Sequence, residues 1–470
     1  MIGTGYVGLV SGVCFADLGN DVICVDKDLS KINSLQKSII PIYEPGLEEL
    51  VRKNSKSGRL KFSTDLSTSI QKSDIIFICV GTPTKKNKYE ADLSQVYSVA
   101  NIISKNIKSF KIIINKSTVP VMTGDKLEKI ISKKTKKNLF SVVSNPEFLR
   151  EGEAIRDFIY PDRVVIGTTD KRSNRILKNL YSPLISKGAK YLNTSRRAAE
   201  LIKYASNAFL ATKITFINEL ANLSEKLDIN IEDVSIGIGS DKRIGSRFLR
   251  AGPAYGGSCF PKDTRALVYT SKASKTNLSV IETVIKSNNK RSDLLLKRIN
   301  SILNKKIKNK KITFLGVTFK ANTDDMRESS SLKMIPYLNK RGAKIRYYDP
   351  SGRKREFDKF KNVNYKPNIK EACINSDLII IHTEWNEFKL IDLKKIVKKR
   401  NFIVYDMRNI YSPEKMRKQW LRQHFVFLFL HVLFANGQMK SFGASAPAEV
   451  LFNHFGITPD RIASEATNLL

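Results

Sequence analysis

Short apolar runs closed by turn residues recur in the first part of the chain and again after residue 310. A run of about four to eight apolar residues bounded by Gly, Pro, Asn or Asp is typical of a strand buried in a parallel sheet. In the first part, the pattern predicts strands at 21–26, 75–80, 111–115, 140–143 and 163–166. In the last part, it predicts strands at 312–317, 344–348, 378–382 and 402–405, with a helix starting at 327–330.

Between these parts the apolar period changes to that of a helix. From Arg196 to about Leu227 the apolar residues fall on one side, and Lys203 and Asn207, four apart, share a face. A lysine and an asparagine on such a helix usually lie on its solvent-exposed face. Their alignment would equally point two hydrogen-bond donors at an oxyanion. The whole pattern predicts an α/β fold with two doubly wound, Rossmann-like domains joined by a helical middle domain with a long central helix. We place the divisions at 1–195, 196–300, 301–419 and 420–470.

Composition narrows the class of protein. With 470 residues, 41% hydrophobic and 27% charged, the chain is typical of a soluble protein of several domains. No stretch reaches the roughly 18 apolar residues of a membrane span and no signal-peptide pattern opens the chain, so we expect a cytoplasmic protein without a membrane partner. The five cysteines form no CxxC pair, so we expect neither disulfides nor a metal site.

The net charge of +36 raises nucleic acid as a partner, because a basic surface gains affinity for any polyanion. The basic residues recur in short runs mixed with Ile and Asn, as in 133–137, 305–311 and 394–400, and no nucleic-acid-binding motif accompanies them. We therefore expect solvated faces and no nucleic-acid partner.

The N-terminal stretch carries a glycine motif. Gly3, Gly5 and Gly8 fit G-x-G-x-x-G at the start of a helix, and the next strand ends in Asp26. In that pattern the glycines let a pyrophosphate approach the helix N-terminus and the acid binds the ribose hydroxyls, which favours NAD over NADP. The first strand should precede Gly3, yet only two residues stand there. Either the start is misassigned or the sheet lacks most of its central strand.

Thr82, Thr118 and Glu147 each follow a predicted strand. Because ligands bind at the carboxyl ends of parallel strands, these three residues are expected to surround one crevice. The alternative is that the Thr-Pro and Asn-Pro pairs near them only favour turns after the strands.

The stretch from Tyr255 to Asp263 is the candidate for covalent chemistry. Gly256 and Gly257 allow close approach of the backbone to a ligand, and Cys259 follows them directly. A thiol reacts as the thiolate, and Lys262 or a helix N-terminus would lower its pKa. The alternative is a buried cysteine that acts as a small hydrophobe, but glycines before it and charges after it make a poor core sequence.

Several motifs together resemble one enzyme family. They are GTGYVGLV at the start, GTPT at 81, STVPV at 117, NPEFLREG at 145, KYASNAFLA at 203, RIGSRFLRAGPAYGGSCFPKD at 243, FKANTDDMRESS at 319 and YDMRN at 405. From residue 1 to about Gln419 the chain resembles the UDP-glucose/GDP-mannose dehydrogenase family, nearest to its UDP-glucose branch. The resemblance implies an NAD-dependent, four-electron oxidation of UDP-glucose to UDP-glucuronate, with UDP-N-acetylmannosamine and GDP-mannose as alternative substrates.

The resemblance also implies roles for residues. Cys259 matches the nucleophile that forms a thiohemiacetal and then a thioester, and Lys203 and Asn207 match the groups that stabilise its oxyanions. Asp263 matches the carboxylate that moves protons through water, Glu147 the base for thioester hydrolysis, and Thr118 the residue that holds the catalytic water. Glu151 is placed one helical turn beyond Glu147, and Arg243 matches an arginine supplied by a neighbouring subunit. The residues implied for the cofactor are Gly3, Gly5, Tyr6, Val7, Gly8, Asp26, Lys31, Thr82, Thr118, Glu151, Lys262 and Arg327. Those implied for the substrate are Glu147, Phe148, Leu149, Lys203, Asn207, Arg243, Arg250, Gly256, Cys259, Phe319, Lys320 and Arg408.

By the same resemblance, 1–195 is the NAD-binding domain, 196–300 the catalytic and dimerisation domain, and 301–419 the UDP-sugar-binding domain. The protein would be a homodimer or a higher homo-oligomer with shared active sites. From Lys440 the tail resembles the last residues of transketolase, the thiamine-diphosphate enzyme, and we assign it no activity. Two other hypotheses stay open: a nucleotide-binding relative with impaired catalysis, and a nucleic-acid binder driven by charge.

Overall fold

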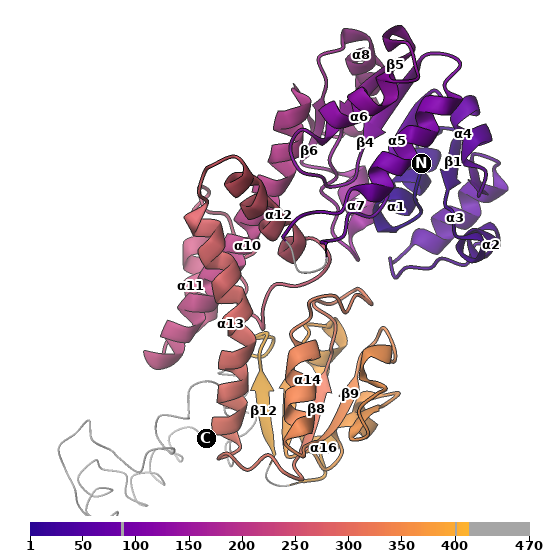
Figure 1. Cartoon of the computed structure of the whole chain (residues 1–470). Helices are drawn as coiled ribbons and strands as arrows, with labels where there is room; N and C mark the ends of the chain where they lie inside the picture. Colours follow the sequence, from indigo (N-terminus) through magenta and orange to yellow (C-terminus); the bar gives the residue numbers. More distant parts are fainter. Residues whose placement is uncertain (86–88, 400–401, 413–470) are drawn as a thin grey trace, which may run out of the picture.

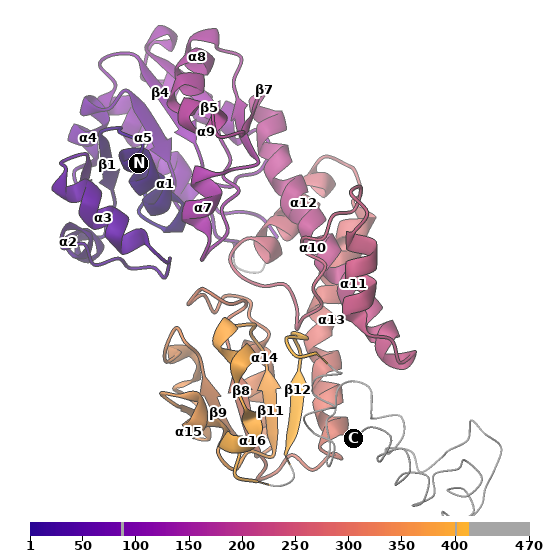
Figure 2. The ribbon, with the colours of Figure 1, turned by 180° about the vertical axis from the view of Figure 1, so that it is seen from behind.

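The computed structural model describes residues 1–85, 89–399 and 402–412. Two α/β units are joined by a bundle of long helices, and the chain passes from the N-terminal unit through the helices to the C-terminal unit (Figures 1 and 2). This architecture confirms the predicted fold class. The tail from 420, with its transketolase-like end, lies outside the described residues. The predicted domain divisions at 195, 300 and 419 stay predictions.

The N-terminal sheet carries seven named strands. Two of them, β1 and β2, pair with each other, and the other five follow in the order β3-β4-β5-β6-β7. The strands are β1 Val22–Val25, β2 Leu60–Ser63, β3 Ile75–Ile78, β4 Lys111–Asn115, β5 Phe140–Ser144, β6 Arg163–Gly167 and β7 Lys190–Thr194.

Ile2 stands for the expected central strand. It forms parallel bridges with Val25 of β1 on one side and with Ile78 of β3 on the other. The amide of Ile2 donates to Phe77 at 2.8 Å, and the amide of Gly3 donates to Val25 at 2.7 Å. Residues 1–3, with Ile2 bridged on both sides, therefore join the two parts of the sheet directly below the glycine loop.

One predicted strand direction is wrong. The run at 163–166 reads as a further parallel strand, but β6 meets β5 antiparallel, through the pair Ser144 and Gly167. Periodicity records which residues are buried and not which way a strand runs, so the sequence pattern could not decide the direction. The parallel partner of β6 is β7, whose mostly exposed residues left no apolar run to detect.

Helices cover both faces of this sheet. All five residues of β4 are buried, and they alternate: Ile112 and Ile114 join a core cluster with α1, while Ile113 joins another with α5 and α6. Burial on two faces explains why the parallel strands read as continuous apolar runs. The helices are α1 Tyr6–Asp17, α2 Leu29–Gln36, α3 Leu47–Lys56, α4 Leu66–Lys72, α5 Ser94–Asn106, α6 Thr123–Ser132, η1 Lys137–Leu139, α7 Ala154–Ile159, α8 Lys171–Leu180 and α9 Ser182–Ile185.

The middle of the chain is helical, as the pattern predicts. The long central helix α10 spans Arg196–Lys226, or about 46 Å at 1.5 Å per residue, and the side chain of Ser195 caps its N-terminus. The other helices here are α11 Ile231–Gly239, α12 Phe260–Ala273 and α13 Ser279–Ile302. Helix α13 runs from this bundle down the side of the C-terminal unit (Figure 1).

The C-terminal sheet has five parallel strands in the order β10-β9-β8-β11-β12. The chain order reverses between β8 and β11, so a crevice is expected at their carboxyl ends. The helix expected from 327–330 starts instead at Ser331, because Glu328 takes a positive φ of 53° that no α-helix accepts. The elements are β8 Lys311–Leu315, α14 Ser331–Lys340, β9 Lys344–Tyr348, η2 Arg355–Phe357, β10 Val363–Tyr365, α15 Ile369–Cys373, β11 Leu378–Ile381, η3 Asn386–Leu390, α16 Leu393–Ile396 and β12 Ile403–Asp406.

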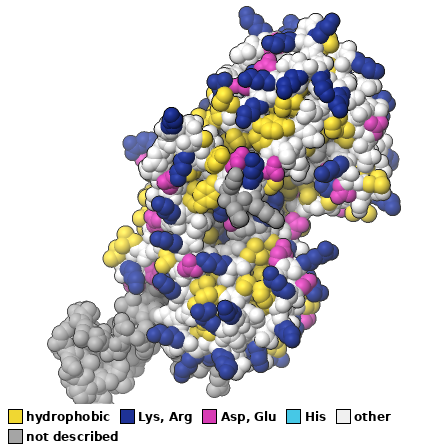
Figure 3. Space-filling model, viewed as in Figure 1, with side chains coloured by type: hydrophobic (Ala, Val, Ile, Leu, Met, Phe, Trp, Pro, Cys, Tyr) yellow, Lys and Arg dark blue, Asp and Glu magenta, His cyan; other side chains and the backbone are white. Residues whose placement is uncertain are grey.

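Lys and Arg side chains are spread over both end units on the face drawn in Figure 3, and they do not gather into one stripe. Such a distribution is typical of solvent-exposed charged residues and does not favour a continuous surface for binding nucleic acid. Among the described residues, no helix is long and apolar enough to cross a membrane.

Candidate active site

The glycine loop forms an open cradle at the N-terminus of α1. Gly3 has a φ of 96°, and a Cβ added to it would meet the carbonyl oxygen of Cys79 at 2.8 Å. A Cβ on Gly8 would meet the carbonyl oxygen of Gly3 at 1.9 Å, whereas one on Gly5 would meet nothing within 4 Å. Gly5 is the N-cap of α1, and no side chain caps the helix. The open space and the uncapped amides fit the pyrophosphate of NAD, with Tyr6 and Val7 as the first helical residues.

Asp26 lies at the end of β1 beside this loop. Its carboxylate accepts hydrogen bonds from the amide of Thr4 at 2.9 Å and from its hydroxyl at 2.8 Å, and Lys31 lies 3.4 Å away. Burial opposes ionisation, but the Thr4 donors and Lys31 outweigh it and lower the pKa of Asp26. A fixed carboxylate at this position suits a ribose diol and repels a 2′-phosphate, so the geometry fits NAD.

Helix α10 brings two buried polar residues into one cluster. The ammonium group of Lys203 pairs with Glu147 at 2.9 Å, and both side chains are only 4% exposed. One turn along, the amide of Asn207 donates to the fully buried carboxylate of Asp263 at 2.6 Å. Residues from the end of β5, from α10 and from α12 therefore meet in one place.

Cys259 is the N-cap residue of α12, and its carbonyl accepts from the amide of Asp263 at 2.8 Å. The expected lowering of the thiol pKa is wrong. Burial, followed by the charge of Asp263, raises the pKa of Cys259 to about 11, and Lys203 and Lys262 only reduce this effect. Lys262 forms an ion pair with Asp263, with 2.5 Å between the ammonium nitrogen and the carboxylate oxygen. The thiol is thus protonated at neutral pH.

Glu147 is ionised although it is buried. Burial opposes its charge, but Lys203 and a 2.5 Å hydrogen bond from the amide of Leu149 lower the pKa of Glu147. Lys116 adds to this effect. It is 4% exposed and donates to Asn145 at 3.2 Å, and burial lowers its own pKa to about 8. The sequence reasoning missed Lys116, and its signal was a lysine two positions after the isoleucine run 112–114 of a predicted strand.

The threonines at the strand ends lie together, because the hydroxyl of Thr82 donates to the carbonyl of Thr118 at 2.8 Å. Phe148 carries two cations over its ring, with Arg163 at 4.1 Å and Lys203 at 5.3 Å from the ring centre. Lys203 therefore contacts both the Phe148 ring and the carboxylate of the preceding residue, Glu147.

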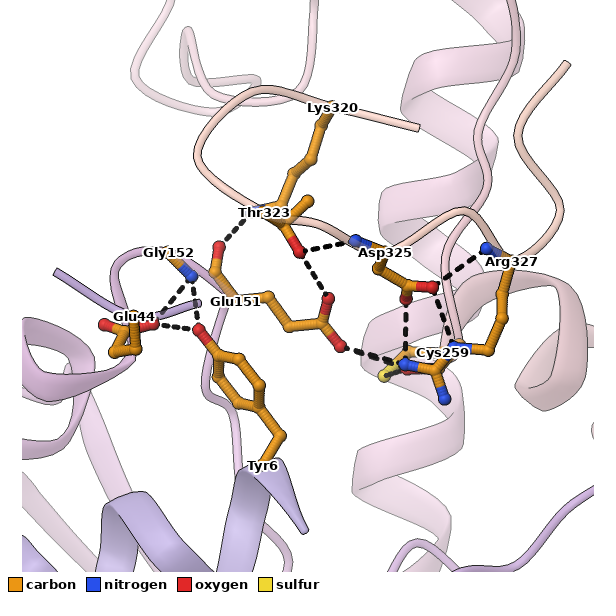
Figure 4. Close-up of polar contacts among 10 residues, drawn as sticks. Tyr6, Glu44, Glu151, Gly152, Cys259, Lys320, Thr323, Asp325 and Arg327 are labelled. Carbon is orange, nitrogen blue, oxygen red and sulfur yellow. Dashed lines mark hydrogen bonds and ion pairs between the residues drawn. The ribbon is translucent and has the colours of Figure 1, made fainter. Parts of the chain in front are cut away.

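Glu151 does not lie one helical turn beyond Glu147, because residues 147–151 form an irregular loop before α7. The loop reaches the C-terminal unit, as Figure 4 shows: Lys320 donates to the carbonyl of Glu151, and Thr323 to its carboxylate at 3.2 Å. Arg327, which is paired with Asp325 at 2.8 Å, lies 3.4 Å from the same carboxylate. Burial, with a further contribution from Asp325, raises the pKa of Glu151 to about 7.

The predicted substrate residues of the C-terminal unit pack against the catalytic loop. The Phe319 ring lies over Gly257, where an added Cβ would come within 2.7 Å of it, and the Phe319 backbone carbonyl accepts from Arg408 at 2.7 Å. Gly256 faces the carbonyl of Glu328 at similarly short range. Larger residues at 256 or 257 would push the catalytic loop away from the C-terminal unit.

A cleft of about 1170 Å³ opens beside this contact. It lies between α11 and the carboxyl ends of β11 and β12. Arg250 and Arg408 both line it, and so does Glu384, which pairs with Arg408 at 2.9 Å. The position of the cleft matches the crevice expected from the strand order. Two arginines in one polar cleft suit the diphosphate of a sugar nucleotide.

Arg243 is not part of this cluster. It lies on an exposed loop after α11 and pairs with Asp241 at 2.6 Å. The predicted site thus divides into a cofactor loop, a buried catalytic cluster and a substrate cleft, with Arg243 apart from all three.

Comparison with known proteins agrees with these three parts. The chain matches the three domain profiles of the UDP-glucose/GDP-mannose dehydrogenase family: the NAD binding domain over residues 1–185, the central domain over 197–290 and the UDP binding domain over 313–413. It is 48% identical to the UDP-glucose 6-dehydrogenase of Rhizobium meliloti over 90% of this chain and 97% of that protein. It is 45% identical to the UDP-glucose 6-dehydrogenase of Rickettsia felis over 92% and 96%.

Solved structures show the same likeness. A UDP-glucose dehydrogenase from the archaeon Pyrobaculum islandicum has a TM-score of 0.82 and 34% identity, over 88% of this chain and 94% of that one. A UDP-N-acetyl-mannosamine dehydrogenase from Staphylococcus aureus has a TM-score of 0.73 and 26% identity, over 90% and 95%. The chain belongs to the UDP-glucose/GDP-mannose dehydrogenase family.

Proposed function

We propose that this member of the UDP-glucose/GDP-mannose dehydrogenase family oxidises UDP-glucose to UDP-glucuronate with NAD as the oxidant. The observation that carries the proposal is the placement of Cys259 at the N-terminus of α12, within the cluster of Lys203, Asn207, Asp263 and Glu147. A four-electron oxidation without release of the aldehyde needs a group that adds to the aldehyde and later leaves, which a thiolate does. The relatives at 45% and 48% identity favour UDP-glucose over the other sugar nucleotides.

The chain's own residues divide the work. The glycine loop and Asp26 hold NAD, with Lys31 beside them, and NAD when bound accepts the hydride of each oxidation. Asp263 takes the proton of the alcohol through water, and Lys203 and Asn207 stabilise the oxyanion that results. Cys259 then adds to the aldehyde carbon as the thiolate, and its proton passes to the nearby carboxylates.

Glu147 completes the reaction. After the second oxidation the sugar carbon is held as a thioester, and Glu147, kept ionised by Lys203, activates the water that attacks it. The C–S bond breaks, the carboxylate leaves and the thiol is restored by the proton that Glu147 accepted. Because burial raises the pKa of the Cys259 thiol to about 11, forming the thiolate depends on transfer of its proton within the cluster.

The proposal includes a homodimer. Phe209, Phe216 and Leu223, spaced by seven along α10, are 65%, 50% and 53% exposed, and Ile236 of α11 is 66% exposed. A stripe of large apolar side chains on one helix is a surface that a second copy would cover. The exposed Arg243 would then serve the substrate cleft of the second copy.

The test is NADH production with UDP-glucose, UDP-N-acetylmannosamine and GDP-mannose in parallel. We expect two NADH for each UDP-glucose and at least about tenfold lower kcat/KM for the other two. Preference for another sugar nucleotide refutes the assigned substrate. Binding of NADH and UDP without turnover would show a catalytically impaired relative instead.

A further inference from the structure

The segment 151–152 is a direct contact between the N-terminal and C-terminal units. Besides the bonds of Glu151 described above, Gly152 has a φ of 81° and packs against Asn322 so closely that an added Cβ would come within 2.1 Å of the Asn322 carbonyl oxygen. Side chains other than hydrogen would therefore separate the units here. The position of this segment sets how the two units meet.

Glu44 holds the segment from the other side. It lies between α2 and α3, is 5% exposed, and accepts from the amide of Gly152 at 2.7 Å and from the amide of Ile155 at 3.3 Å. Its third partner is the hydroxyl of Tyr6, which also accepts from the Gly152 amide at 2.5 Å (Figure 4). A carboxylate taken out of water needs such a set of donors, so their positions relative to one another are fixed.

Tyr6 is the first residue of α1 and belongs to the glycine loop. A chain of hydrogen bonds therefore runs from the cofactor loop through Tyr6 and Glu44 to Gly152, and from Glu151 to Thr323 and Arg327 of the C-terminal unit. The donors that Glu44 accepts from belong to the glycine loop and to residues 152–155, so its effect is on how these two parts are positioned.

We infer that Glu44 is a positioning residue, which couples binding at the cofactor loop to closure of the C-terminal unit over the substrate. The inference rests on the proposed function, since it requires the two ligands to bind on the two units. With NAD present, Tyr6 and Gly152 are held in register, and the contact with the C-terminal unit costs less to form. Each ligand then tightens the binding of the other, because the coupling free energy between two sites is reciprocal.

The experiment measures binding and not turnover. UDP and NADH are titrated separately and together, by calorimetry, into the wild type, Glu44→Gln, Tyr6→Phe and Glu49→Gln. Glu49 is an exposed glutamate on α3, close to Glu44 in the sequence, and provides the matched control. In Glu44→Gln the side-chain NH₂ group would face a donor in place of an acceptor, so one of the present hydrogen bonds is lost. In Tyr6→Phe the hydroxyl that donates to Glu44 is lost.

We expect UDP to bind the wild type and Glu49→Gln at least about fivefold more tightly when NADH is present, within the usual range of allosteric coupling. In Glu44→Gln and Tyr6→Phe the ratio should fall below about twofold, while UDP alone binds as in the wild type. A purely structural role would weaken both ligands and leave the ratio unchanged, which overturns the inference. Wild-type protein that binds both ligands without coupling also overturns it. Binding of neither ligand overturns the proposed function as well. If Glu44→Gln fails to fold, Tyr6→Phe decides.

Discussion

Replacing Lys203 by methionine should lower the free energy of unfolding by about 3–5 kcal/mol, because it leaves the carboxylate of Glu147 buried without its partner. The two groups are 2.9 Å apart, which corresponds to about 6 kcal/mol of attraction at an effective dielectric constant of about 20. Most of that attraction offsets the cost of taking both charges out of water. The stability that Lys203→Met loses is therefore mainly the cost of leaving the Glu147 carboxylate buried without a partner. The ion pair itself adds little net stability.

Two further variants test this argument. In Lys203→Met/Glu147→Gln both charges are gone, and we expect stability within about 1–2 kcal/mol of the wild type. Lys53→Met breaks the exposed pair with Asp17, which has a similar separation of 2.8 Å, and should cost less than about 1 kcal/mol. Urea unfolding followed by far-UV circular dichroism gives all four values, provided that the transitions are cooperative.

The deficit of Lys203→Met should depend on pH. In the wild type the pKa of Glu147 is lowered by folding, so its contribution is present above the unfolded carboxyl pKa and is lost as pH falls through the folded value. Without Lys203, only the Leu149 amide and the charge of Lys116 still oppose the effect of burial. The pKa of Glu147 therefore rises, and protonation relieves the variant as pH falls. The gap between the two proteins should be largest near neutral pH and shrink toward pH 4. Equal stability of the single and double variants at pH 7, or a gap that widens in acid, would refute the reasoning.

Three other outcomes are expected. Cys259→Ser should abolish UDP-glucuronate formation while UDP affinity changes less than about twofold, and steady turnover by this variant would remove Cys259 from its role. Because burial raises the pKa of that thiol to about 11, its alkylation by iodoacetamide should accelerate close to tenfold per pH unit from pH 7 to 9, whereas a plateau below pH 8 would contradict the raised pKa. Asp26→Ala should weaken NADH binding at least about tenfold and leave UDP binding unchanged, and equal losses for both ligands would argue against its place at the ribose.

Much of the fold could be predicted because its strands are buried on both faces. The runs at 111–115 and 344–348 correspond to β4 and β9 residue for residue, and the helix expected from Arg196 is α10. The strands that escaped prediction are short or exposed, as β7 is, since without burial no apolar run marks them. The direction of β6 escaped too, because a strand carries the same pattern whichever way it runs.

The sequence by itself determined that Thr82, Thr118 and Glu147 follow buried strands. It also determined that a glycine loop, an acid at Asp26 and a cysteine after two glycines are present, because each is a local pattern. Only the tertiary structure decided that Glu147 meets Lys203 and that Asn207 meets Asp263, since these partners are 56 residues apart in the chain. It also decided that the pKa of Cys259 rises, because burial outweighs the nearby lysines. Glu44 shows the same limit: a glutamate between two helices has no local sign of function, and its role comes from donors more than 100 residues away that folding brings to it.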